Sequence, residues 1–381
     1  MNFLQFPYLV QIEILQHFQL YEFFFLGMCS KRAKILVQRL GPKYDKAVID
    51  CLFSCIGVQT TGIVRPLSDD VDQVVMYSAE NKPENVHLRN KKPFWKKRIE
   101  LNFRKKRIRC RISSHPVKRI PILWCKREYI KLLPMALHYH ICDIFNLSTD
   151  IQIKFRVSDI SEFPDTNVVD NLKAHGVIWN EDDVSRTLFE NIRIKNSLWL
   201  STKLLFEPEH HIFSANHIYS YSSKWVTVDH LMKFQGRSVW FMDAVSIGTE
   251  ELVTFINDWL NGSNTKLEVM FVGSGSSEHP KFDKEKTMKS FDFFPWNPEK
   301  RGGRFKYPQT FALINETDTS DCTREMDIER ESDGTLATIM IEDFYFRFYV
   351  WHERFPDPST TQPEFYEQNS MTFFTIGNIT F

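Results

Sequence analysis

The sequence lacks the long apolar segment that a membrane-spanning helix requires. No apolar run approaches the roughly 18–20 residues of such a helix, and no charged stretch followed by an apolar one opens the chain, as it would in a secretory signal. Seven cysteines, an odd number, are scattered along the 381 residues. We therefore expect a protein of a reducing compartment, the cytosol or the nucleus, with its cysteines packed in the core and with no membrane contact.

Metal ligands at the spacing of a zinc site are missing as well. Cys51 and Cys55 stand four residues apart, but no second cysteine pair follows at the expected distance. His138 and Cys142 would share one face of a helix, whereas His140 would point elsewhere. Two ligands do not make a metal site, so we expect neither a metal nor any other cofactor.

Catalytic motifs and an excess of charge are also absent. The 48 Lys and Arg balance the 48 Asp and Glu, so net charge favours neither nucleic acid nor anionic lipid. Residues 273–277 are rich in glycine and serine but lack the Gly-Lys-Ser/Thr ending of a P-loop. The polar cluster around Pro208 matches no catalytic motif; it contains Glu207, Glu209, His210, His211 and His217. We expect a protein that is not an enzyme.

Apolar residues, and above all phenylalanine, are abundant. They make up 43% of the chain, with 33 phenylalanines, which suffices for packed cores and argues against wholesale disorder. The length allows one small module and one or two domains of about 100–200 residues each.

Residues 6–40 predict three short helices. Pro7 suits a first helical turn, and the apolar residues after it recur at helical spacing. Ser30 is a good N-cap for the third helix, which Gly41-Pro42 would end. Such a unit is too small to fold well alone, and it carries more apolar surface than its own core needs. The spare surface suggests a partner.

This segment resembles an F-box, in the FPxL…IL…F…CSKRAK form of a large nematode family. The resemblance implies docking onto the Skp-type adaptor of a Skp–cullin–F-box ubiquitin ligase, and through it onto a cullin. The candidate adaptor-binding residues are Phe6, Pro7, Val10, Ile14, Leu15, Phe18, Cys29, Lys31 and Arg32. Without the CSKRAK segment, an ordinary helical hairpin packed on the rest of the chain would be the favoured interpretation.

The next segment predicts helix, then strand, then helix. Apolar residues from Ala47 to Cys55 fall on one helical face that ends at Gly57, and residues 71–77 resemble a strand. Residues 129–145 have apolar residues three and four apart, which predicts a helix with a kink or a later start at Pro134.

A dense basic run lies between these elements. Residues 91–111 hold eleven Lys or Arg and one acid, Glu100. Apolar and polar residues alternate on both sides of its centre, which predicts a β-hairpin with one apolar and one basic face. Two interpretations remain open: a solvated strand face, or a surface for an acidic protein or, less favoured, nucleic acid. The candidate target-binding residues are Arg104, Lys105, Lys106 and Arg107.

From residue 151 to 272, short strands alternate with helices. The strand candidates are 151–157, 189–194, 198–200, 218–221, 238–245 and 267–272, with a short helix at 228–234. The clearest helix is 249–260, which Thr249 can cap and whose apolar residues share one face. Strand starts 20–29 residues apart predict parallel units with right-handed crossovers, like a degenerate leucine-rich repeat.

Residues 226–272 resemble the type 2 F-box-associated domain, which follows the F-box in the same nematode family. Its signature is a helix closing in F…WxxGSNPRLE before a strand. That pattern is kept by Phe255, Trp259, Gly262, Ser263, Asn264, Leu267 and Glu268. Thr265 and Lys266 depart from the usual proline and arginine.

The C-terminal part predicts a return to β structure. Residues 278–309 are expected to be an irregular connection. Ser332-Asp333-Gly334 then marks a hairpin between strands at 326–331 and 335–341, and 345–351 adds a third antiparallel strand.

We therefore expect an α+β or mixed α/β fold in four parts. These are the three-helix F-box at 1–45, a helix with a β-rich connecting region at 46–150, leucine-rich-repeat-like strand–helix units at 151–275, and an irregular connection with an antiparallel β meander at 276–381. The resemblances imply a substrate-recognition subunit, in which the F-box holds the adaptor and the large domain binds an unknown protein target. The alternative is a binding module unrelated to ubiquitin that uses the basic hairpin.

Overall fold

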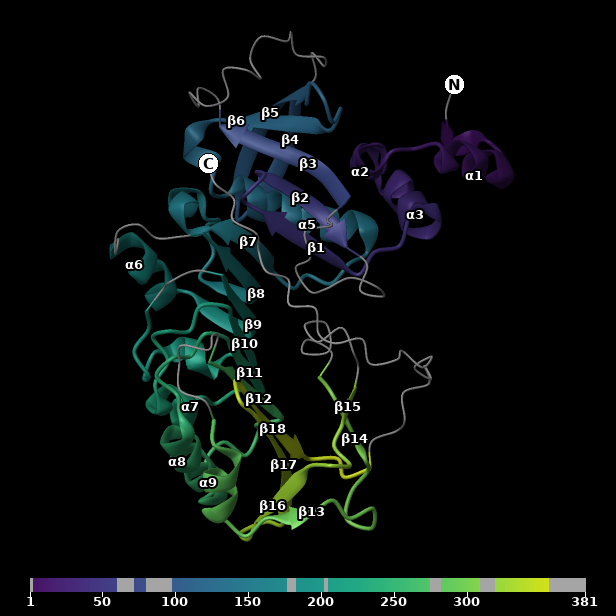
Figure 1. The fold of residues 1–381 in the computed structure, drawn as a ribbon. Coiled ribbons are helices and arrows are strands. Elements are labelled where there is room, and N and C mark those ends of the chain that lie inside the picture. The colour runs from purple at the N-terminus through teal and green to yellow at the C-terminus, as the bar shows by residue number, and fades with distance from the viewer. Residues whose placement is uncertain are drawn as a thin grey trace.

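One 16-stranded sheet runs through the computed structural model of the chain (Figure 1). The structure describes residues 3–59, 72–79, 98–176, 183–201, 205–274, 282–308 and 319–355. The strand order is β13-β16-β17-β18-β12-β11-β10-β9-β8-β7-β1-β2-β3-β6-β5-β4, and a two-stranded ribbon, β14-β15, stands apart from it. This mixture of helices and one large sheet agrees with the expected α+β class. Within the described ranges, no helix is long and apolar enough to cross a membrane.

The N-terminal residues form the three predicted helices. After the 3₁₀ turn η1 (Phe3–Gln5) come α1 (Tyr8–Gln16), α2 (Leu20–Cys29) and α3 (Lys31–Leu40). The Ser30 hydroxyl accepts a hydrogen bond from the Ala33 N–H at 3.1 Å, which caps α3 as expected. The Gly41 N–H donates to the Val37 carbonyl at 2.7 Å, where α3 ends.

The helix expected over residues 47–57 is wrong, because these residues form a hairpin. β1 (Lys46–Asp50) and β2 (Cys55–Gln59) pair antiparallel, and nearly every position is buried. A strand buried on both faces has apolar residues throughout, and such a run imitates helical spacing. The Asp50 carboxylate accepts the N–H groups of Leu52 at 3.0 Å and Phe53 at 3.3 Å, which turns the chain between the strands.

The basic run forms the predicted hairpin at one end of the sheet. β4 (Arg98–Phe103) and β5 (Lys106–Ser114) pair antiparallel, and φ values of 45° at Arg104 and 63° at Lys105 make the turn. β3 (Asp72–Ala79) and β6 (Pro121–Cys125) join the hairpin to β2. Residues 91–97 of the basic run and residue 71 of the expected strand lie outside the described residues.

Helix α5 (Leu133–Phe145) follows the short 3₁₀ turn η3 (Arg127–Tyr129). Pro134 stands in its first turn, so the helix starts later than Tyr129 instead of kinking.

In the described residues between 152 and 273, six parallel strands each lie beside the next in sequence. They are β7 (Gln152–Arg156), β8 (Val168–His175), β9 (Arg193–Ser201), β10 (His217–Ser220), β11 (Ser238–Phe241) and β12 (Val269–Gly273). The connections contain η4 (Val157–Glu162), α6 (Asp183–Asn191), η5 (His211–Ser214), α7 (Val228–Lys233) and α8 (Thr249–Leu260). The helices α6, α7 and α8 line one side of the strands (Figure 1). Parallel strand–helix units are therefore confirmed, whereas a relation to leucine-rich repeats stays a prediction.

Three details of this region differ from the sequence expectations. Phe189 lies in α6, because the apolar residues of a helix end and a strand start merge into one alternating run. The strand from Ser238 ends at Phe241, since a φ of 61° at Asp243 turns the chain. The N-cap of α8 is Gly248, whose N–H donates to the Glu251 carboxylate at 2.9 Å, so Thr249 is not the cap.

The C-terminal residues form the predicted meander. The elements are α9 (Lys284–Lys289), β13 (Phe294–Pro295), β14 (Arg304–Lys306), β15 (Thr319–Asp321), β16 (Met326–Arg330), β17 (Thr335–Glu342) and β18 (Tyr345–Trp351). The connection expected to be irregular thus contains a short helix and two short strands. β18 pairs antiparallel with β12 and β1 pairs parallel with β7, so the sheet continues across residues 150 and 275. The four-part division stays a prediction.

Candidate interaction surfaces

The first forty residues expose a group of large apolar side chains. Tyr8, Leu9 and Val10 of α1 are 60%, 77% and 41% exposed, and Ile35 of α3 is 50% exposed. They are four of the ten exposed large apolar side chains in the described part of the chain. Because exposed apolar groups concentrated on one module mark interaction surfaces, α1 and the outer side of α3 form the first candidate.

The predicted adaptor-binding residues differ in their exposure. Pro7, Val10, Cys29, Lys31 and Arg32 are exposed, whereas Phe6, Ile14 and Phe18 are half-buried and Leu15 is buried. Leu15 is 3% exposed, so its side chain belongs to the core of the helices. Sequence reasoning missed Tyr8 and Leu9, because three consecutive apolar residues do not reveal which side of a helix faces water. It also missed Ile35 of α3.

Contacts with α5 fix α2 and α3 to the rest of the molecule. A Cβ added to Gly27 would lie 2.6 Å from Ile144 Cγ2, so α2 and α5 cross closely. The Lys34 ammonium pairs with the Asp143 carboxylate at 2.8 Å, and the Gln38 amide donates to the Asp143 carbonyl at 2.8 Å. These contacts occupy the inner sides of α2 and α3 and leave α1 and the outer side of α3 accessible.

The second candidate is the arginine face, the outer face of the β4–β5 hairpin. Its exposed residues form the cross-strand pairs Arg98–Arg111, Glu100–Arg109 and Asn102–Arg107. On the opposite face, Leu101 and Ile108 are buried, and the Phe103 ring stacks on Tyr139 of α5 at 5.7 Å. Packing of this apolar face against the core and α5 fixes the position of the hairpin and of its basic side chains.

Two carboxylates lie near these cations. Glu100 accepts a hydrogen bond from Arg109 Nε at 2.8 Å and pairs with Arg107 Nε at 3.3 Å. At the turn, Arg104 donates to the Asp165 carbonyl at 3.3 Å and lies 3.7 Å from its carboxylate. Counted over the described residues of β4 and β5, the arginine face holds four guanidinium groups and one carboxylate, which sum to +3. The predicted Lys105 and Lys106 are exposed at and beside the turn.

A cleft of about 440 Å³ opens next to the turn. Residues of η4, of the segment after η4 and of α6 line it together with Lys131, which precedes α5; Phe163 and Pro164 are buried, and Lys131 and Asp165 are exposed. Arg104 contacts this cleft through Asp165, so the hairpin and the cleft form one continuous surface.

The histidines near Pro208 support the fold. His230 Nδ1 accepts the Thr227 N–H at 3.0 Å, which leaves Nε2 to donate to the Phe206 carbonyl at 2.8 Å. His217 Nδ1 lies 2.5 Å from the Ser238 hydroxyl oxygen, between β10 and β11. Burial, with a contribution from Arg237, lowers the pKa of His217 to about 4, so the ring is neutral near pH 7.

His138 and Cys142, the other possible metal ligands, are also buried side chains that support the fold. His138 Nε2 lies 3.7 Å from Cys142 Sγ, as expected for residues one helical turn apart. Burial raises the pKa of Cys142 to about 12 and lowers that of His138, which keeps both neutral. Among the residues that the structure describes, no three His, Cys, Asp or Glu are grouped to hold a metal ion.

The sheet face opposite the helices carries an aromatic row. The register sets Trp199, Tyr219, Trp240 and Phe271 side by side on β9 to β12. Ring centroids are 4.5 Å apart both for Trp199 with Tyr219 and for Trp240 with Phe271. Trp199, Tyr219 and Phe271 are buried, so this row stabilises the sheet and is not an open surface.

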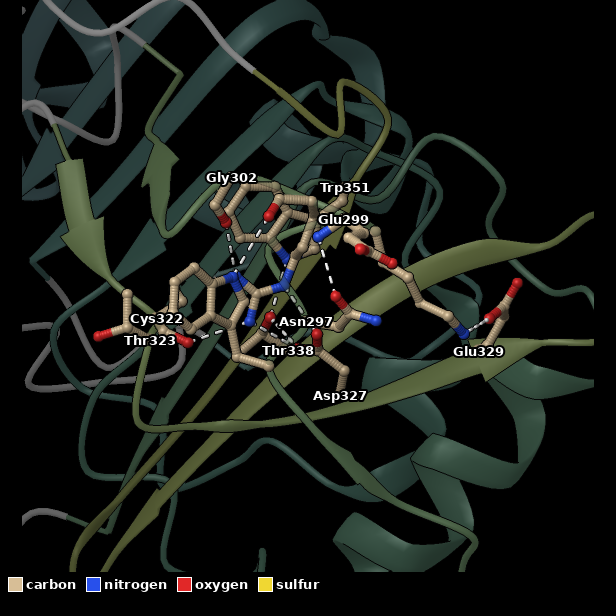
Figure 2. Close-up of polar contacts among 12 residues, drawn as sticks. Asn297, Glu299, Gly302, Cys322, Thr323, Asp327, Glu329, Thr338 and Trp351 are labelled. Carbon is tan, nitrogen blue, oxygen red and sulfur yellow. Dashed lines mark hydrogen bonds and ion pairs between the residues drawn. The ribbon is translucent and has the colours of Figure 1, made fainter.

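A buried ion pair closes the same face near the meander (Figure 2). The Arg301 guanidinium donates to both carboxylate oxygens of Asp327 at 2.8 Å and lies 4.4 Å from the centre of the Trp351 ring. The Thr338 hydroxyl donates to Asp327 at 2.6 Å and accepts from the Trp351 indole at 2.8 Å. Neither charge is exposed, so this cluster anchors the loop that carries Arg301 and offers no open site.

Comparison with known proteins finds a family similar to part of the chain. Residues 209–272, from η5 to β12, match the model of the F-box associated family, and the match leaves the three N-terminal helices outside it. An uncharacterized protein of Caenorhabditis elegans is 29% identical over 232 residues, which cover 57% of this chain and 50% of the relative. The chain therefore spans about half the length of that relative. No solved structure matches. Residues 209–272 are thus similar to a family of domains associated with F-boxes.

Proposed function

We propose that the chain is a substrate-recognition subunit of a Skp–cullin–F-box ubiquitin ligase. The N-terminal helices bind a Skp-type adaptor and the large sheet domain binds a protein target. The observation that carries this proposal is the exposed apolar surface of α1 and α3, made by Tyr8, Leu9, Val10 and Ile35. The match of residues 209–272 to the F-box associated family supports it.

Docking of an adaptor would bury these side chains. A Leu or Ile side chain gains about 1.5–3 kcal/mol when it leaves water completely. Lys31 and Arg32 are exposed at the start of α3, where they would form the polar rim of the interface. The anchors we propose are therefore Leu9 and Val10 of α1 and Ile35 of α3.

The proposed role requires no chemistry from the chain itself. A receptor brings a target close to the ubiquitin-carrying enzyme, so it contributes proximity and orientation. We propose that the chain is not an enzyme, uses no cofactor and acts in the cytosol or nucleus, where such ligases work.

Binding to a purified nematode Skp-type adaptor tests the proposal. The test variant is Leu9→Asp with Ile35→Asp, and the control is Leu205→Asp, since Leu205 is 57% exposed outside the N-terminal helices. Both are surface changes, so both proteins should fold. We expect the test variant to lose adaptor binding at least 100-fold, because charge placed in an apolar interface is not compensated. Equal affinity of the two variants would reject the proposed interface.

The arginine face supports a second candidate, a binding module unrelated to ubiquitin. Within residues 98–127, eleven Lys and Arg stand against one acid, Glu100, in a chain without net charge. Such segregation favours an anionic partner. The adaptor assay separates the candidates, because a module of this kind would show no adaptor binding in the unmodified protein.

A further inference from the structure

The arginine face places guanidinium groups at a regular spacing. Arg107, Arg109 and Arg111 occupy alternate positions of β5 and are all exposed. Alternate residues of a strand lie about 6.5–7 Å apart. An extended peptide with an acidic residue at every second position has the same repeat. Arg107 and Arg109 reach across to Glu100 of β4, so their guanidinium groups lie toward a strand that would pair with the outer edge of β4.

Arg107 and Arg109 retain donors for such carboxylates. The Glu100 carboxylate contacts the Nε atoms of Arg107 and Arg109. Each guanidinium has four further N–H groups on its terminal nitrogens. The Arg107 and Arg109 side chains are 62% and 65% exposed. A guanidinium that shares one carboxylate can therefore bind a second one with favourable geometry.

Strand β4 is the last strand of the sheet order among the described residues. Its inner edge pairs with β5, and the outer edge of a terminal strand presents backbone N–H and C=O groups to a further strand. The hairpin is fixed from below, where Leu101 and Ile108 are buried and Phe103 stacks on α5. A rigid edge lowers the entropy cost of adding a strand.

We propose that the target protein binds as an extended acidic segment that adds to the outer edge of β4 and directs alternate carboxylates onto the arginine face. This inference rests on the proposed function, because it takes the anionic partner to be the target. The segment leaves β4 near Phe103, where the turn residue Arg104 leads to the cleft beside Asp165.

Nucleic acid fits this surface less well. Single strands bind where bases can stack on aromatic side chains beside the cations. The aromatic residue opposite Arg111 is Trp124, which is half-buried and donates to the Ser113 hydroxyl at 2.6 Å. The indole is thus held by its own sheet, whereas the backbone edge of β4 suits a peptide.

Fluorescence anisotropy with the full chain and an octapeptide of alternating Val and Glu tests the proposal. A peptide of alternating Val and Lys tests whether binding requires negatively charged side chains. A Val-Glu peptide N-methylated at each valine tests strand addition, since it lacks the donors that pairing requires. We expect binding of the unmodified Val-Glu peptide, at least tenfold weaker binding of both others, and weakening with added salt. Equal binding of the N-methylated peptide, or no binding of the Val-Glu peptide, would overturn strand addition.

Matched charge reversals locate the site. The test variant is Arg107→Glu, Arg109→Glu and Arg111→Glu, and the control is Lys284→Glu, Lys286→Glu and Lys289→Glu on the exposed helix α9. We expect the test variant to bind the Val-Glu peptide at least tenfold more weakly and the control to bind it normally. An equal loss of peptide affinity in both variants would show that only the overall charge of the protein matters, and would refute the site. A single-stranded oligonucleotide that binds the full chain more tightly than the peptide would also overturn it.

The adaptor assay on the same variants separates the two proposals. The arginine face lies outside α1 and α3, so the test variant should keep full adaptor affinity. Peptide binding without adaptor binding in the unmodified protein would reject the proposed function and keep the peptide site. Adaptor binding without peptide binding would reject the peptide site alone.

Discussion

The guanidinium of Arg330 lies 4.6 Å from the centre of the Trp259 ring, and both side chains are almost completely buried. Arg330 comes from β16 and Trp259 from the last turn of α8, so the contact joins the meander to the parallel strand–helix units. Arg330 also binds the Asp333 carboxylate through Nη2 at 2.8 Å, which keeps its charge compensated at the buried position.

Replacement of Trp259 by Ala should strongly destabilise the chain. The change removes a buried indole and its contact with the Phe348 ring at 5.0 Å, and we expect a loss of about 3–5 kcal/mol in the free energy of unfolding. Urea denaturation measures it, with Trp124→Ala on a half-buried side chain as the control. A Trp259→Ala protein with an unchanged midpoint would contradict the packing described for α8.

For the buried pair of Arg301 and Asp327, removing one charge should destabilise the chain more than removing both charges. Asp327→Asn leaves the Arg301 charge uncompensated and should cost about 3–5 kcal/mol. The double variant Arg301→Met with Asp327→Leu removes both charges and should recover most of that loss. Thermal denaturation of the three proteins measures the pattern. A double variant that is less stable than Asp327→Asn would show that the pair itself is strongly stabilising.

Sequence patterns predicted the elements whose stability is mostly local. Ser30 caps α3 as expected, and Leu252, Phe255, Ile256 and Trp259 are buried on one face of α8. The hairpin around Arg104 also followed from simple alternation. Where a strand is buried on both faces, apolar residues stand at consecutive positions and the alternation that marks a strand is lost, as at Ala47, Val48 and Ile49 of β1.

Long-range pairing was beyond the sequence. Nothing local to Val269 or Tyr349 indicates that these residues pair across β12 and β18 to continue the sheet into the meander. Exposure was equally hard to predict, since it depends on how α1 packs. For this reason Leu15 was expected at the adaptor surface although it is buried, and Leu9 was not singled out although it is exposed.

Stability should fall as the pH decreases from 7 to 5. The pKa of His217 is lowered to about 4 in the folded chain, against about 6.5 in the unfolded chain. Between these values the unfolded state binds more protons, so unfolding becomes easier as the pH falls. His217 alone should contribute about 2 kcal/mol over this interval.

Denaturation of His217→Gln at both pH values checks this contribution. Glutamine keeps a polar side chain near the Ser238 hydroxyl but does not titrate. We expect the variant to lose less stability than the parent between pH 7 and pH 5. The same pH dependence in both proteins would show that His217 is not the titrating group.

Because α2 and α5 cross closely, the destabilisation caused by a larger residue at Gly27 should be partly relieved by a smaller residue at Ile144. Gly27→Ala should destabilise by about 1–3 kcal/mol, because its Cβ would lie 2.6 Å from Ile144 Cγ2. Adding Ile144→Ala to Gly27→Ala should cost less than the same change in the parent, since it removes the clash. Additive losses in the double-mutant cycle would contradict the crossing and the attachment of the N-terminal helices.

Co-elution with a cullin is the most direct test of the proposed role in a ubiquitin ligase. Size-exclusion chromatography of the full chain with a purified cullin, with and without a Skp-type adaptor, asks whether the chain enters a ligase. We expect the chain to elute with the cullin only when the adaptor is present, and the Leu9→Asp, Ile35→Asp variant to elute alone in both cases. A chain that elutes apart from adaptor and cullin at micromolar concentrations would contradict it.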